Sequence, residues 1–206
     1  MTIVFELLLL TILPSLFLLI YFIKTDKYPE PTPILIKTFT LGILICFPAG
    51  YLNYLIINDD YHSFLAAITE EPLKFLILYF YIKRQKHFDE PIDGIVYGAT
   101  ASLGFATFEN FDYVFNYAES MEESFLIAGV RSFSAVPMHA LCGAIMGFHF
   151  GQYIFKKQNI QMLLCLLVPI LIHASYNYAT NFEGIYYLFV VLFSMVYFQK
   201  IKKRLV

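Results

Sequence analysis

The chain has 206 residues, of which 59% are hydrophobic, 18% aromatic and only 15% charged. Soluble domains carry about 25% charged residues, and a soluble core of this size could not hide so much apolar surface. The net charge of −2 gives no reason to expect a nucleic-acid partner. Composition therefore favours an integral membrane protein in contact with lipid.

Seven apolar segments predict an all-α, polytopic transmembrane helix bundle, because a spanning helix needs about 20 mostly apolar residues. They are residues 2–23, 34–57, 63–82, 94–116, 125–155, 160–180 and 184–199. The first lacks a basic leader and a small-residue cleavage site, so we expect a retained span. The fifth is too long for one straight span, and a separate interfacial piece at 124–131 would give eight helices. No repeat or linker divides residues 1–206, so we expect one transmembrane domain.

The connections between these segments alternate in charge. Basic residues follow the first, third and fifth segments and form the tail: Lys24, Lys27, Lys83, Arg84, Lys86, Lys156, Lys157, Lys200, Lys202, Lys203 and Arg204. The second, fourth and sixth connections carry acidic residues and neither lysine nor arginine: Asp59, Asp60, Glu119, Glu122, Glu123 and Glu183. Because basic connections stay in the cytoplasm, the pattern predicts an N-terminus outside, a C-terminus inside and seven crossings.

The apolar segments contain polar groups that are costly at bilayer depth, where such groups usually mark function. They are Glu70, Glu71, Lys74, Glu109, Asn110, Arg131, His139, His173 and Asn177. Counted from the predicted outer ends, Glu70, Glu109 and His173 lie roughly 10–12 Å below the outer surface at 1.5 Å per residue. His139 joins this layer only if the outer part of the fifth segment lies along the interface. A shared depth favours one site over unrelated structural residues.

Local spacing adds chemistry to this layer. Glu70 and Lys74 are four residues apart and share a helix face, whereas Glu71 points about 100° away. Pro72 removes a helical hydrogen bond and disfavours helical geometry at Glu71. His173 and Asn177 also share a face, and together they could donate hydrogen bonds to a carbonyl oxygen that becomes an oxyanion.

Two further patterns predict structure and not chemistry. Small residues at 98–102 and from Gly143 to Gly147 let helices approach closely, and we expect the second group to pack inside the chain and not to form a dimer interface. Asp93 stands directly before Gly94 at a predicted helix start, so an N-cap is a sufficient explanation for it.

Four motifs in order carry a resemblance: Glu70-Glu71-x-x-Lys74, Phe105-Ala106-x-x-Glu109-Asn110, His139-Ala140 and His173-x-x-x-Asn177. With the stretch FDEPIDGIVYGATASLGFATFEN, they resemble the PrsW family of intramembrane proteases, from about Asp26 to the last segment. The resemblance implies a bacterial cell-membrane enzyme that makes the site-1 cut in a single-pass anti-sigma factor, outside the cytoplasm, under envelope stress. The chain is more distantly similar to CAAX prenyl proteases, in which a histidine stands where this chain has Glu109.

Peptide hydrolysis needs an activated water, a stabilised oxyanion and a proton for the leaving amine. We predict Glu70 as the base and Glu109 as its partner, with His139, His173 and Asn177 also catalytic. The structural alternative for Glu70 is an ion pair with Lys74 or Arg131. Supporting or uncertain roles fall to the remaining residues: Glu71 either acts in catalysis or neutralises a cation, Lys74 and Arg131 form ion pairs, and Asn110 orients Glu109.

The sequence leaves the cofactor and two rival functions open. Zinc bound by Glu70, Glu109, His139 and His173 is one possibility, but no HExxH motif is present, and a metal-free glutamate mechanism is comparably supported. An ion- or proton-coupled transporter would also use intramembrane Glu, His and Lys, although no internal repeat supports it. A membrane scaffold held by these polar groups is the third possibility.

Overall fold

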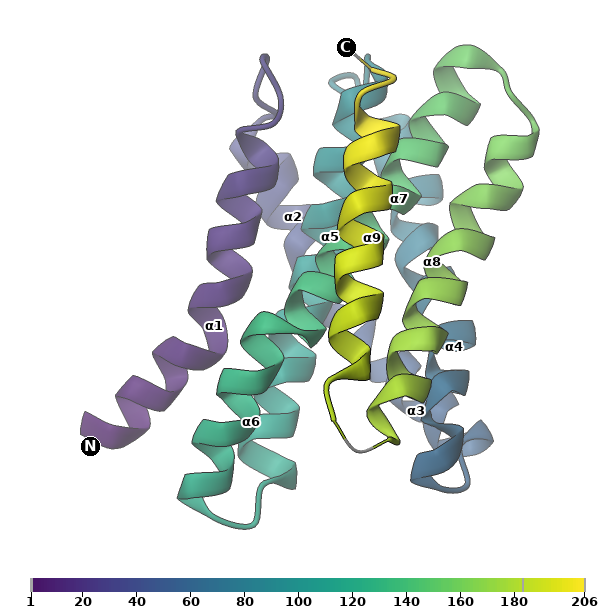
Figure 1. The fold of residues 1–206 in the computed structure, drawn as a ribbon. Coiled ribbons are helices and arrows are strands. Elements are labelled where there is room, and N and C mark those ends of the chain that lie inside the picture. Colours follow the sequence, from purple (N-terminus) through teal and green to yellow (C-terminus); the bar gives the residue numbers. More distant parts are fainter. Residues whose placement is uncertain (1, 183, 206) are drawn as a thin grey trace.

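The computed structural model describes residues 2–182 and 184–205, and within these ranges the chain forms helices and no strand (Figure 1). Glu183, one of the acidic residues expected outside, lies outside the described residues. The α-helices are α1 (Thr2–Ile23), α2 (Thr32–Leu44), α3 (Cys46–Ile56), α4 (Ala66–Leu76), α5 (Pro91–Asp112), α6 (Met121–Phe133), α7 (Ala135–Lys156), α8 (Ile160–Thr180) and α9 (Tyr186–Lys202). Short 3₁₀ segments are η1 (Asp60–Leu65) and η3 (Ile82–Arg84), and π-helical turns are η2 (Ile77–Tyr81) and η4 (Tyr113–Tyr117).

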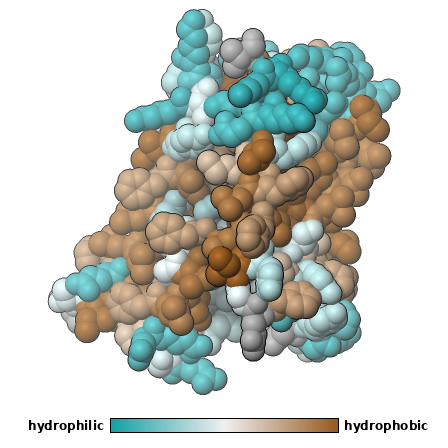
Figure 2. Space-filling view, in the orientation of Figure 1, coloured by the Kyte–Doolittle hydropathy of each residue, from teal (hydrophilic) through white to brown (hydrophobic). Residues whose placement is uncertain are grey.

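The bundle has the surface of a protein that lies in a bilayer. Four helical segments of the described chain are long and apolar enough to cross a membrane: Thr2–Ile23, Thr32–Ile56, Met121–Lys156 and Ile160–Thr180. A wide hydrophobic band separates two more hydrophilic ends on the face seen in Figure 2. The chain is therefore an all-α, polytopic membrane protein, as its composition predicts.

Prolines explain two interruptions of the predicted segments. A proline ring clashes with the carbonyl group four residues earlier, and it has no N–H to donate. Pro48 and Pro137 stand four residues after Leu44 and Phe133, which are the last residues of α2 and α6. The long fifth segment is thus split, with Ser134 in a non-helical conformation between α6 and α7. Pro72, in contrast, is accommodated inside α4, which continues to Leu76.

α5 occupies the centre of the bundle and packs most extensively on α7, with α2 and α1 on its other sides. Glycines make the α5–α7 contact possible. A Cβ atom on Gly147 would lie 1.7 Å from the carbonyl oxygen of Gly94, and one on Gly98 would lie 2.2 Å from that of Gly143. The predicted close approach of these small residues is confirmed, and the Gly143–Gly147 pair packs inside the chain.

The two chain ends lie at opposite ends of the bundle (Figure 1), as an odd number of crossings requires. The α1–α2, η3–α5 and α7–α8 connections gather with the C-terminal tail at one end, which we call the basic end. This end carries a hydrophilic cap in Figure 2. The arrangement agrees with the predicted placement of the basic connections on one side of the membrane.

We predict that Gly147→Ala destabilises the fold, because its new methyl group must push α5 and α7 apart. Overpacking a close contact costs about 1–3 kcal/mol, and a clash with backbone leaves little room to relax. Thermal unfolding in detergent measures the change. Gly129→Ala on α6 is the matched control, since a Cβ there meets nothing within 4 Å. Equal melting temperatures for the two variants would contradict the packing described above.

Candidate active site

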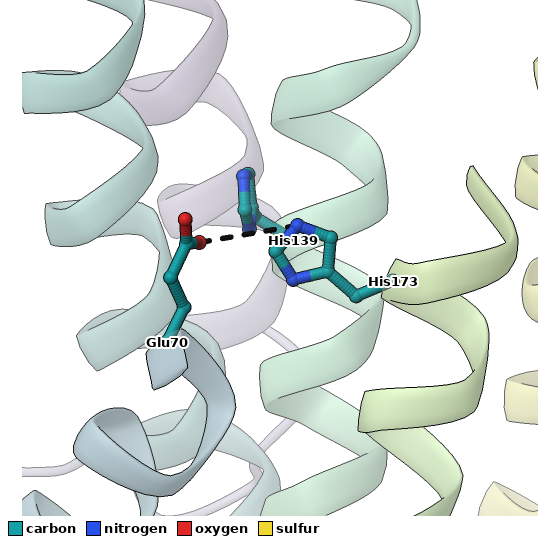
Figure 3. A group of neighbouring side chains, drawn as sticks. All are labelled: Glu70, His139 and His173. Atoms are coloured by element: carbon teal, nitrogen blue, oxygen red, sulfur yellow. Dashed lines mark ion pairs between the residues drawn. The ribbon is translucent and has the colours of Figure 1, made fainter. Parts of the chain in front are cut away.

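Five helices bring all nine predicted site residues into one continuous network. Glu70, Glu71 and Lys74 come from α4, Glu109 and Asn110 from α5, Arg131 from α6, His139 from α7, and His173 and Asn177 from α8. Figure 3 shows Glu70, His139 and His173 converging from three of these helices. The polar groups assigned to one layer therefore lie together in the structure, and His139 is among them.

Glu71 is the fully buried anion of the network, with 0% exposure. Its Oε1 accepts hydrogen bonds from Lys74 Nζ and from His173 Nδ1, each at 2.8 Å. Because a carboxylate can only accept, His173 carries its proton on Nδ1 and leaves Nε2 as an acceptor. Glu71 thus neutralises Lys74 and fixes the orientation of His173.

Lys74 continues the network toward α7. Its ammonium group lies 3.0 Å from His139 Nδ1 and 4.1 Å from the centre of the Phe105 ring. An ammonium group can only donate, so His139 Nδ1 accepts and Nε2 carries the proton. His139 Nε2 then donates to Glu109 Oε2 at 3.0 Å.

Glu109 forms its ion pair with Arg131, through the same Oε2 atom. Arg131 also donates from Nε to Asn110 Oδ1 at 3.0 Å, and its guanidinium carbon lies 3.9 Å from the centre of the Tyr113 ring. Asn110 is anchored in turn through its amide to the Thr11 carbonyl at 2.8 Å. Asn110 therefore holds Arg131 directly and Glu109 through it, an arrangement compatible with the orienting role predicted for Asn110.

Glu70, like Glu71, has one buried oxygen without a hydrogen-bond partner, but its other contacts are weaker. Oε1 accepts from Asn53 Nδ2 at 3.1 Å. Oε2 is buried and makes no hydrogen bond to any described residue; it lies 3.7 Å from Lys74 Nζ and 3.9 Å from His173 Nε2. The contact to His173 is drawn in Figure 3. The ion pair of Glu70 with Lys74 is thus looser than that of Glu71, and Arg131 is paired elsewhere.

Asn53 on α3 and Thr69 on α4 are site residues that the sequence reasoning missed. The Thr69 hydroxyl bonds to Asn53 Oδ1, which directs the amide nitrogen of Asn53 toward Glu70. A usable signal was present, because Asn53 stands among apolar residues of the second segment and Thr69 directly precedes Glu70.

Asn177 is positioned to hold His173 and not to bind a substrate oxygen. Its Nδ2 lies 3.1 Å from the Ser63 carbonyl and 3.3 Å from His173 Nε2, so both of its N–H groups have acceptors. The role of oxyanion donor predicted for His173 and Asn177 therefore does not match these hydrogen bonds.

Glu70, His139 and His173 form a group that fits a metal ion. One ligand atom from each lies within 4.8 Å of the others, and all three residues are buried. The unpartnered Oε2 of Glu70 and the acceptor Nε2 of His173 are the kinds of atom that bind zinc. Both nitrogens of His139 have protein partners, and His173 Nε2 accepts from Asn177, so an ion would replace one partner of each histidine. Glu109, a fourth predicted ligand, lies outside this group and is bound to Arg131.

A cavity of about 810 Å³ adjoins the network. Glu70, Glu109, Arg131, His139 and Asn177 line it, whereas Glu71 and Lys74 do not. Further lining residues come from the segments farthest from the basic end: Ile57, Ser63, Tyr117 and Thr180. A molecule that enters from that end can reach Glu70, while Glu71 stays sealed behind it.

Comparison with known proteins agrees with this chemistry. Residues 30–199 match the model of the PrsW family intramembrane metalloproteases. The chain is 39% identical to the protease PrsW of Bacillus subtilis strain 168 over 178 residues, which are 81% of this chain and 79% of that protein. It is 35% identical to the PrsW of Geobacillus kaustophilus, covering 84% and 79%, and 34% identical to that of Oceanobacillus iheyensis, covering 93% of both. No solved structure matches.

The family match extends over most of the chain and includes α3 to α8, which carry the network; α1, which holds Asn110 through Thr11, lies before its first residue. The chain therefore belongs to the PrsW family of intramembrane proteases, and it is a multi-pass membrane peptidase of bacteria.

Proposed function

We propose that this peptidase hydrolyses a peptide bond of a single-pass membrane protein close to the extracytoplasmic face, with Glu70 as the residue that accepts the proton of the attacking water. The observation that carries the proposal is the unpartnered Oε2 of Glu70, which is buried at the wall of the cavity and close to two histidines. A buried carboxylate oxygen without a donor is costly for folding alone, and such costs collect at functional sites.

The chemistry follows from the residues around Glu70. The water oxygen adds to the scissile carbonyl carbon, and Glu70 takes its proton. Arg131 lines the cavity. Its positive charge stabilises the negative charge that develops on the carbonyl oxygen. When the carbon–nitrogen bond breaks, the protonated carboxyl group of Glu70 returns the proton to the leaving amine.

Glu70, His139 and His173 would hold a zinc ion in this site. Such an ion would supply a water of lowered pKa and would polarise the substrate carbonyl. The family description supports a metal, and the donor set is compatible with one. Glu70 is required both in a metal-free mechanism, where it acts directly as a base, and in a zinc-dependent mechanism, where it holds the ion. Removal of metal is therefore the measurement that distinguishes the two mechanisms.

The side of cleavage follows from charge and from the cavity. The positive-inside rule puts the basic end in the cytoplasm. The cavity is lined by residues next to the opposite connections, so its access lies on the extracytoplasmic side. Membership of the PrsW family supports an anti-sigma factor as the substrate and a site-1 cut, which would begin release of a sigma factor under envelope stress.

We predict that Glu70→Gln lowers cleavage of a tagged single-pass substrate at least 100-fold, since loss of a general base costs about 10²–10⁴-fold. The variant keeps an oxygen that accepts from Asn53, so its melting temperature should stay near that of the unaltered chain. Reconstituted protein and mapping of the cleaved fragments measure the rate of cleavage and the side of the membrane on which it occurs.

The control is Glu122→Gln, which changes an exposed carboxylate on α6 and keeps full activity. Cleavage that survives Glu70→Ala, Glu109→Ala and His173→Ala alike would remove the proposal.

Chelation is expected to abolish cleavage and added zinc to restore it. Metal analysis of the purified chain should find zinc that His173→Ala loses, because an imidazole ligand is missing. If activity is indifferent to chelation and no zinc is found, the metal is excluded and Glu70 acts alone.

Glu71→Gln should destabilise the fold, because Lys74 then remains buried without its closest anion. Breaking a buried pair costs about 3–5 kcal/mol, whereas removing both charges is far cheaper. The double variant Glu71→Gln, Lys74→Met should therefore regain much of the lost thermal stability in detergent. A single variant as stable as the unaltered chain would show that Glu71 is no structural partner of Lys74.

A further inference from the structure

A second group of buried carboxylates lies at the basic end, away from the candidate active site. Asp26, Glu30 and Asp93 are 6%, 7% and 1% exposed. One carboxylate oxygen from each lies within 4.8 Å of the other two. Asp26 and Glu30 belong to the connection between α1 and α2, and Asp93 lies in the first turn of α5.

The hydrogen bonds of this group are incomplete. Asp26 Oδ1 accepts from the Tyr28 N–H at 2.8 Å, but Oδ2 is buried with no partner among the described residues. Glu30 accepts the hydroxyl of Tyr97. Asp93 Oδ2 accepts from the N–H groups of residues 89 and 90, each at 2.8 Å. Asp93 is thus the third helical residue in a capping box with Glu90, whereas the sequence predicted it as the N-cap itself.

The three carboxylates also lack a cation. Within residues 2–182 and 184–205, no lysine, arginine or histidine nitrogen lies within 4.0 Å of any of them. Burial raises the pKa of Glu30 to about 8, and the carboxylates of Asp93 and Asp26 add to this effect. Three carboxylates brought together out of water cannot all stay ionised unless a positive charge joins them.

Space for a hydrated ion is present beside the group. A cavity of about 500 Å³ is lined by Glu30 and Asp93 and by Tyr28, His87, Asp89 and Glu90. It therefore offers further oxygen atoms and room for water, which complete the coordination of hard cations.

We propose that Asp26, Glu30 and Asp93 bind a divalent cation of the Mg²⁺ or Ca²⁺ class at the basic end. An all-oxygen donor set favours these ions over zinc or copper. The unpartnered Asp26 oxygen supplies a ligand that no protein group uses. The bound ion ties the α1–α2 connection to the start of α5, the helix that carries Glu109 to the candidate active site.

The test measures thermal unfolding of the full chain in detergent, first stripped with chelator and then titrated separately with Mg²⁺ and Ca²⁺. A ligand at about 100 times its Kd should raise the melting temperature by about 5–10 °C for a chain of this size. The cation that gives the larger rise in melting temperature at the lower concentration is identified as the bound ion. Asp26→Asn keeps the acceptor for Tyr28 and should lose the shift, and Glu30→Gln keeps an acceptor for Tyr97 and should lose it too.

Two controls locate the effect. Glu70→Gln must retain the shift, since the ion binds away from the candidate active site, and this result stands whether or not the chain cleaves its proposed substrate. Glu122→Gln must also retain it. If Asp26→Asn or Glu30→Gln fails to fold, tyrosine-sensitised Tb³⁺ luminescence of the unaltered chain is measured in place of that variant's thermal shift. Ca²⁺ or Mg²⁺ should displace the Tb³⁺ and lower the luminescence. Absence of any cation shift, absence of that luminescence, or a full shift in Asp26→Asn overturns the proposal.

Discussion

A charge held at membrane depth has to find its counter-charge inside the protein, because lipid supplies neither charge nor hydrogen bonds. This chain meets the requirement with one relay that runs from Glu71 through Lys74 and His139 to Glu109 and Arg131. Glu71 and Lys74 both lie on α4, and each later link joins one helix to another, so the relay also fixes α4, α5, α6 and α7 relative to one another. Removing one of its charged members leaves an uncompensated charge, which makes the relay a cooperative unit and not a set of separate pairs.

The relay depends on apolar packing that looks unrelated to chemistry. His139 reaches both Lys74 and Glu109 because α7 lies against α5 at backbone distance, with Gly98 facing Gly143. Side chains at that contact would widen the gap and lengthen both hydrogen bonds of His139. Small residues in the centre of the bundle therefore act on the site through geometry, although none of them touches it.

Much of this arrangement could be predicted from sequence, and the missing parts have a common physical cause. Apolar runs and buried charges are local signals, so the helical class and the layer of polar residues were accessible. Partner choice is not local: the sequence offered Arg131 to Glu70, but α6 presents it to Glu109. The position of Asn53 in an apolar run signalled a polar role, but its contact with Glu70 depends on how α3 faces α4, which the sequence does not show. The helix ends before Pro48 and Pro137, in contrast, follow from proline sterics and were open to prediction.

The adjacent carboxylates of α4 illustrate how one helix can separate structure from reaction. Glu71 is fully buried and holds Lys74 and His173 by hydrogen bonds. The ammonium group of Lys74 is thereby kept near Glu70 Oε2 without a hydrogen bond to it. Glu70 keeps one oxygen free at the cavity wall, where a water or an ion can approach. Each carboxylate has one oxygen without a hydrogen-bond partner, so the two differ in their access to the cavity and in their distance from Lys74 Nζ, which is 3.7 Å for Glu70 and 2.8 Å for Glu71. The difference between neighbours of the same residue type is thus the feature that a hydrolytic site in a membrane requires, and it arises from the 100° turn between consecutive helical positions.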